Sequence, residues 1–228
     1  MRRVRWLGAQ WPISIRTLAA RMKGQLFVTD SLDGFVIERV RDTSIEAHYV
    51  EKLIYEETIT DPFGQETTYE RIGYRQIDFS LHSEFPNIEL RDSHRSTRAF
   101  ISKILELCDF SVSIEPLSVD LLGWASRFEI EHESPVTIDS LQVSGVTVTP
   151  GVQATMLLKG DADVRPALGI LASQGKFNLE KLQIRIPVSN RSVRVHLSSS
   201  ASARIPEECW NDLLPTLRKS LAAQKNEE

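Results

Sequence analysis

The strongest constraint on the fold is a turn signal at residues 61–64, Asp-Pro-Phe-Gly, between two runs rich in β-branched and aromatic residues, 47–60 and 65–82. Pro62 presets the φ angle of a type I turn, and Asp61 can accept hydrogen bonds from the amides that follow it. Gly64 supplies the left-handed residue that a bulged hairpin needs. The sequence therefore predicts a long antiparallel hairpin.

The second strand of this hairpin changes the parity of its apolar residues. Ile72 and Tyr74 are at even positions, whereas Ile77, Phe79 and Leu81 are at odd positions. A bulge or bend near Gly73 would restore one buried face. Long bent strands favour a curled sheet or half-barrel over a flat sheet.

The remaining chain reads as an α+β protein with curved antiparallel β-meander sheets packed with about four amphipathic helices. We expect either one compact unit, 1–228, or two tightly packed halves, 1–110 and 111–228. The expected helices start near 15, between 93 and 97, near 163 and at 206. The first, second and last carry an apolar stripe at helical spacing, and the third is indicated by Asp163 as a cap and Pro166 in its first turn. The expected strands form hairpins at 25–40 and 181–197 and a meander at 110–158.

Composition places the chain among folded proteins of the cytoplasm. It has 228 residues, 41% apolar residues and a net charge of −4, so it is neither disordered nor of low complexity. No run approaches 18 apolar residues, and no secretory leader is recognisable, so we expect no membrane contact. Cys108 and Cys209 lack metal or redox spacing and are expected to be reduced and structural.

The sequence lacks the local motifs of common catalysts. It has no GxGxxG, GxxxxGK[ST] or GxSxG, and its five histidines show no HxH, HxxxH or HExxH spacing. We therefore assign no catalytic residue, no metal ligand and no cofactor, and favour a protein that is not an enzyme.

Charge is unevenly distributed along the chain. Residues 109–139 carry seven acids and one base, and residues 176–204 carry six bases and one acid. The two segments can be solvated faces, can meet within one fold, or can attract each other head to tail between copies.

The basic hairpin is the main candidate for binding nucleic acid or a partner. With residues 189–192 as its loop, Val188, Ile186 and Ile184 form an apolar face with the second strand. The register then places Arg185 opposite His196 and Pro187 opposite Arg194. One interpretation is that cations protect an edge strand from unwanted pairing. The other is that they contact phosphate. The cationic side chains of the predicted outer face are Lys181, Arg185, Arg194 and His196.

A second candidate anion site precedes the helix expected at 97–108. His94, Arg95 and Arg98 lie where free backbone amides of a helix N-terminus can hold a phosphate. The alternative is an ordinary capped helix, with Ser93 or Ser96 as the cap.

The leading hypothesis is a non-catalytic binding or assembly module that engages a protein partner or its own copies. The first alternative is a nucleic-acid or phosphate-binding protein that uses the hairpin 181–197. In a version with phosphodiester chemistry, His196 would be the general acid or base. A further alternative is a carrier of a small apolar ligand inside the curled sheet.

Overall fold

The computed structural model describes residues 1–93, 96–188 and 191–225. The chain divides into two compact units. We call residues 9–113 the arm unit, and residues 1–8 with 114–228 the basic unit, after the features described below.

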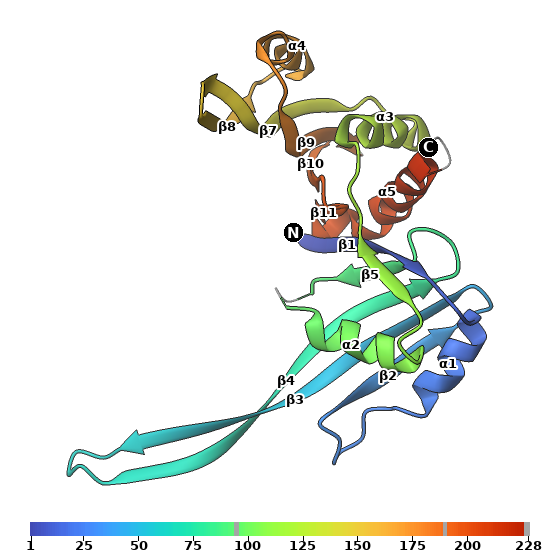
Figure 1. Cartoon of the computed structure of the whole chain (residues 1–228), viewed down its shortest axis with the longest axis vertical. Coiled ribbons are helices and arrows are strands. Elements are labelled where there is room, and N and C mark those ends of the chain that lie inside the picture. Colours follow the sequence, from blue (N-terminus) through green and yellow to red (C-terminus); the bar gives the residue numbers. More distant parts are fainter. Residues whose placement is uncertain (94–95, 189–190, 226–228) are drawn as a thin grey trace. The chain divides into compact units, whose positions relative to one another are not determined.

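The arm unit contains four antiparallel strands of the sheet and two helices (Figure 1). Its strands follow the order β2-β3-β4-β5. Its elements are α1 (Ile15–Lys23), β2 (Asp33–Val40), β3 (Ser44–Thr60), β4 (Glu66–His82), β5 (Ile88–Arg91) and α2 (Arg98–Leu107).

Four aromatic rings form the centre of this unit. Phe79 from β4 lies 4.7 Å from Phe100 of α2, and Phe35 and Tyr49 complete the cluster at centroid distances of 5.6 to 6.0 Å. Tilted and edge-on rings at such distances attract each other beyond the gain from burial alone. The cluster thereby fixes which face of β3 and β4 is buried.

The predicted turn at 61–64 is confirmed. The Asp61 carboxylate oxygen Oδ1 accepts hydrogen bonds from the Phe63 and Gln65 amides, both at 2.8 Å, and Gly64 has φ +84°. The hairpin is longer than the rest of its sheet, and the paired ends of β3 and β4 extend beyond α1 and α2 (Figure 1). We call this extension, residues 53–73, the arm.

The predicted bulge near Gly73 is wrong. β3 and β4 pair without a register shift from Ser44↔His82 to Thr60↔Glu66. Ile72 and Tyr74 instead lie on the face opposite to the buried one, at 52% and 62% exposure. The parity changes because apolar residues occupy the outer face of the arm, and no extra residue is needed.

The predicted hairpin at 25–40 is also wrong. β2 pairs with β3, and residues 25–27 only bridge β2, in parallel orientation, through Leu26↔Phe35. Gly34 permits this approach, because a Cβ there would stand 2.6 Å from the Phe27 backbone nitrogen. The segment crosses the edge of β2 instead of forming a strand of its own.

The basic unit contains the remaining antiparallel strands and three helices. Its strand order is β1-β11-β10-β9-β7-β8, with β6 paired to β1. Its elements are β1 (Arg2–Gln10), β6 (Ser113–Pro116), α3 (Leu121–His132), β7 (Thr137–Thr149), β8 (Val152–Lys159), α4 (Arg165–Gln174), β9 (Asn178–Val188), β10 (Arg191–Ser198), β11 (Ser202–Ile205), the 3-10 turn Glu207–Cys209 and α5 (Trp210–Lys225). The last two residues of β1 and the first residue of β6 belong to the arm unit.

Trp124 of α3 organises the core of this unit. Its ring meets Trp6 edge-on at 5.7 Å, and its indole nitrogen donates to the Leu217 carbonyl and the Ser220 hydroxyl of α5, both at 3.1 Å. The buried N–H is thus satisfied while the ring fills the space between the helices and the sheet. α3 packs against β9 and α5 against β11, and the two helices contact each other.

The meander expected at 110–158 is partly wrong, because residues 121–132 form the helix α3. Asp120 caps it, with its carboxylate accepting from the Leu122 and Gly123 amides. Leu121, Trp124, Ala125 and Phe128 supply a buried stripe at helical spacing. This cap and stripe are readable in the sequence, and the described residues contain five α-helices against about four expected.

The register of the basic hairpin differs from the prediction by two residues. Arg194 lies opposite Arg185 and His196 opposite Gln183, and Val188 pairs with Arg191. The four-residue loop expected at 189–192 is wrong, because Arg191 and Ser192 are paired strand residues of β10. The other two, Ser189 and Asn190, lie outside the described residues. Because side chains alternate with a period of two, this shift leaves every residue on its predicted face.

The α+β class with antiparallel sheets is confirmed, and the strands of neither unit close into a barrel. Cys108 and Cys209 are free and buried, as expected. Among the described helices, none is long and apolar enough to span a membrane.

Candidate interaction surfaces

The outer face of β9, β10 and β11 gathers the predicted cations of the basic hairpin. The core side of these strands buries Leu182, Ile184, Val195 and other apolar residues, so the alternate residues point outward. Two hollows of about 500 and 360 Å³ lie on the outer face. We call the surface the basic face, and its cationic residues are Arg3, Lys159, Lys181, Arg185, Arg194 and Arg204.

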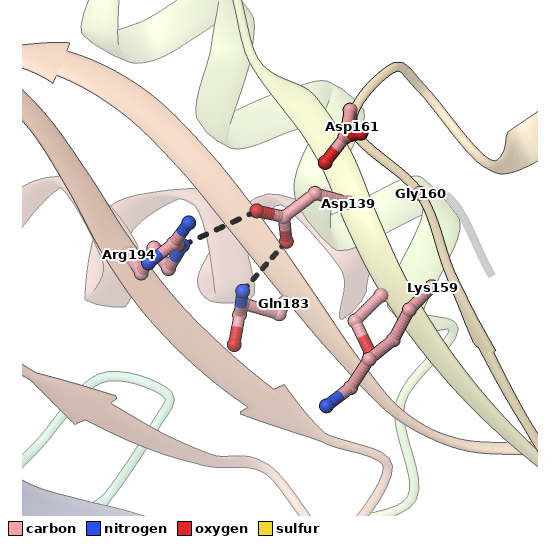
Figure 2. A pocket seen from close by; sticks show the side chains of 7 residues that line it. Asp139, Lys159, Gly160, Asp161, Gln183 and Arg194 are labelled. Atoms are coloured by element: carbon pink, nitrogen blue, oxygen red, sulfur yellow. Dashed lines mark hydrogen bonds and ion pairs between the residues drawn. The ribbon is translucent and has the colours of Figure 1, made fainter.

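Asp139 lies at the centre of the larger hollow (Figure 2). It is the extra residue of a β-bulge between Ile138 and Ser140 of β7, which turns its carboxylate toward β9 and β10. Gln183 donates to it at 2.7 Å and Arg194 at 3.4 Å, and the carboxylate is only 6% exposed. The Arg194 side chain remains 61% exposed, so most of it still faces solvent.

His196 lies in the smaller hollow, beside Arg204. Burial is the main cause that lowers its pKa, and the positive charges of Arg204 and Arg194 lower it further against the opposing effect of Asp139. The imidazole is therefore neutral at pH 7, and its nitrogens can donate and accept hydrogen bonds.

The edge-strand interpretation of these cations fails. β9 pairs with β10 on one side and β7 on the other, and β10 lies between β9 and β11. Only the end of β9 near Pro187 extends past β7, whose pairing with β9 starts at Thr137↔Arg185. The cations of the basic face therefore do not serve to block a free strand edge.

The second predicted anion site is not assembled by the described residues. His94 and Arg95 lie outside them, and Arg98 is an exposed residue in the first turn of α2. The N-cap is Thr97, without a side-chain hydrogen bond, so the expected caps Ser93 and Ser96 are wrong.

The arm is a surface that the sequence analysis did not single out. Apart from the half-buried Asp61, every residue from 54 to 72 is exposed. Phe63, at the turn, is 95% exposed. The exposed large apolar and aromatic side chains of the arm are Ile54, Tyr55, Ile59, Phe63, Tyr69 and Ile72.

The outer half of the arm is also acidic. Residues 56–70 contain five carboxylates and no lysine or arginine. Glu56 lies directly opposite Glu70, on the face of the arm that also carries Ile54 opposite Ile72. We call this face, formed by the even-numbered residues of both strands, the even face of the arm.

The arm unit holds one further polar cluster that sequence reasoning missed. His48 of β3 contacts the Glu38 carboxylate through Nε2 at 2.9 Å and the Asp78 carboxylate through Nδ1 at 2.7 Å. Only the pairing of β2, β3 and β4 brings these residues together, since they are far apart in the sequence. Across the described ranges, no three histidine, cysteine, aspartate or glutamate side chains group as a metal site does.

The acidic segment 109–139 does not form one surface. Asp120 caps α3, Glu129 accepts from the Val136 amide, and Asp139 lies in the basic face. Asp139 and Arg194 show that the acidic and basic segments meet in part within one fold.

Searched against models of known protein families and against curated proteins, the chain matches none.

We predict that His196 titrates below the ordinary histidine pKa of 6.5 in the folded protein. Because an unfolded histidine binds a proton near that value and folded His196 does not, this residue lowers the free energy of unfolding as the pH falls below 6.5. Arg204→Gln removes a charge that lowers the pKa and should raise it, whereas Lys176→Gln, in a loop, should not. NMR titration of the His196 imidazole measures its pKa in the wild type and in both variants. A pKa at or above 6.5 in the wild type contradicts the geometry of the basic face.

Proposed function

We propose that this chain is a non-catalytic binding and assembly module whose main contact element is the arm. The observation that carries the proposal is the exposure of a two-stranded ribbon that holds six large apolar or aromatic side chains over residues 54–72. Its partner is a protein surface, and copies of the chain itself are the first partner to examine.

A ribbon of this kind gains stability from being covered. Two strands without a second layer are marginally stable in water, because neither face buries enough apolar surface to offset the lost chain entropy. Contiguous exposed apolar surface on a folded protein marks a contact with another macromolecule. Aromatic side chains such as Phe63 are the usual anchors of such contacts.

The charge of the arm supports a protein as the partner. Five carboxylates and no cation between 56 and 70 repel the phosphates of nucleic acids and of anionic membranes. A surface that offers cations together with apolar contacts suits this arm, and proteins supply both.

We expect Phe63→Ser to reduce self-association of the chain about tenfold or more, because truncating a fully exposed aromatic anchor removes on the order of 2 kcal/mol of binding free energy. Sedimentation velocity over a range of protein concentrations measures the effect, with the wild type forming species above the 25.8 kDa of one chain.

Phe110→Ser is the matched control, since Phe110 is also an exposed phenylalanine of the arm unit but lies outside the arm. It should associate as the wild type does. Equal association of all three proteins, or a wild type that stays a single chain throughout, contradicts the proposed function.

A second candidate function, binding of nucleic acid, is favoured by the basic face alone. Five cations line the two hollows there, Arg185 lies opposite Arg194 on the paired strand, and two carboxylates, Asp139 and Asp161, lie among them. Phosphate contacts from arginine and lysine give sequence-independent binding that weakens steeply with salt. Charged linings do not favour the apolar ligand of a carrier.

We expect that, if this second candidate is right, Arg185→Glu with Arg194→Glu abolishes a salt-dependent affinity for a fluorescent 20-nucleotide single strand in anisotropy titrations. Lys23→Glu with Lys176→Glu makes the same change of net charge away from the basic face and should leave that affinity nearly intact. An unchanged affinity in the first variant removes the basic face from nucleic-acid binding.

A further inference from the structure

Two surfaces of this chain carry like charges directly opposite each other on paired strands. On the even face of the arm, Glu56 is the pairing partner of Glu70. On the basic face, Arg185 is the pairing partner of Arg194. Directly opposite residues have Cβ atoms about 5 Å apart, and like charges in that position destabilise a sheet.

Contacts within each unit offset this repulsion only in part. Arg185 donates to the Asp161 carbonyl at 2.8 Å, and Arg194 reaches Asp139 at 3.4 Å. The two glutamates are both exposed. A pair of opposite sign from outside the unit would relieve the repulsion on either side.

We propose that the even face of the arm of one copy docks on the basic face of a second copy, with Glu56 and Glu70 meeting Arg185 and Arg194. This inference rests on the proposed function and names the partner and the surface that receive the arm. The strand pairs β3/β4 and β9/β10 both advance about 6.7 Å for every two residues. If one row of paired residues on the arm lies over one row of the basic face, the neighbouring rows are therefore aligned as well.

The neighbouring rows also match in character. On one side of the charged row, an apolar pair of the arm faces a row that contains an exposed proline. On the other side, two threonines face a glutamine and the neutral imidazole, and the next row again joins an acid to a cation. The four rows are Ile54/Ile72 with Pro187/Ser192, Glu56/Glu70 with Arg185/Arg194, Thr58/Thr68 with Gln183/His196, and Thr60/Glu66 with Lys181/Ser198.

Phe63 would then lie beyond the last row, at the tip of the docked arm. Arginine side chains attract aromatic faces as well as carboxylates. A surface rich in arginine can therefore contact both Phe63 and the carboxylates of the arm. Donor and receiver are different surfaces of the chain. Such a contact joins copies head to tail into a ring or an open filament, or closes a pair in which the arm of each copy docks on the basic face of the other.

The experiment exchanges the charges of the two surfaces and measures self-association by sedimentation velocity at low salt. Glu56→Lys with Glu70→Lys, or Arg185→Glu with Arg194→Glu, should each lower the association constant at least tenfold. The variant with all four changes should return to within about threefold of the wild type. Raising the salt concentration should weaken association of the wild type, because the contact is charged.

Neighbouring residues of the arm provide the control for the docking face. Glu56→Lys should weaken association, whereas Glu57→Lys, the same change on the opposite face of the ribbon, should weaken it much less. Equal effects of the two substitutions contradict docking through the even face.

The remaining outcomes separate this inference from the proposed function. If Phe63→Ser weakens association and the arginine variant does not, the arm is a contact element that binds elsewhere, and this inference fails alone. If both charge variants weaken association and the exchange restores nothing, the two rows do not meet. If the arginine variant loses only its affinity for a 20-nucleotide strand, the basic face serves nucleic acid, and this inference is wrong.

Discussion

The burial of alternate strand residues is the constraint on which both surfaces depend. Ala47 pairs with Phe79 and Tyr49 with Ile77 on the buried face of the arm unit, and the pairing continues without a shift into the arm. A slip of one residue would turn this buried face outward and bring charges into the core. The cost of such a slip holds the acidic and apolar rows of the arm on their observed face.

The sequence predicts much of this arrangement, because its strongest signals are local. The turn at 61–64 depends on neighbouring residues alone, and its hydrogen bonds are those expected from an aspartate followed by a proline and a glycine. The common face of Lys181, Arg185, Arg194 and His196 was predictable in spite of a wrong register, because an error of two residues preserves the face of every side chain.

Other features depend on contacts that a single sequence does not reveal. The exposure of Ile72 and Tyr74 was missed, because an apolar residue in a strand has the same pattern whether another layer covers it or not. Asp139 joins the basic face only through a bulge and the pairing of β7 with β9. By contrast, the cap and apolar stripe of α3 are local, but its Gly123 and the prolines around it are also typical of a meander, which is why the prediction differs from the structure there.

Site-specific crosslinking from the arm tests the account most directly. A photoreactive benzoylphenylalanine in place of Thr58, in an equal mixture of ¹⁴N- and ¹⁵N-labelled chains, reports what the even face touches and in which copy. The account predicts crosslinks to residues 181–198 that join light to heavy chains. Crosslinks confined to one chain, crosslinks to other regions, or none at concentrations where the protein associates would contradict it.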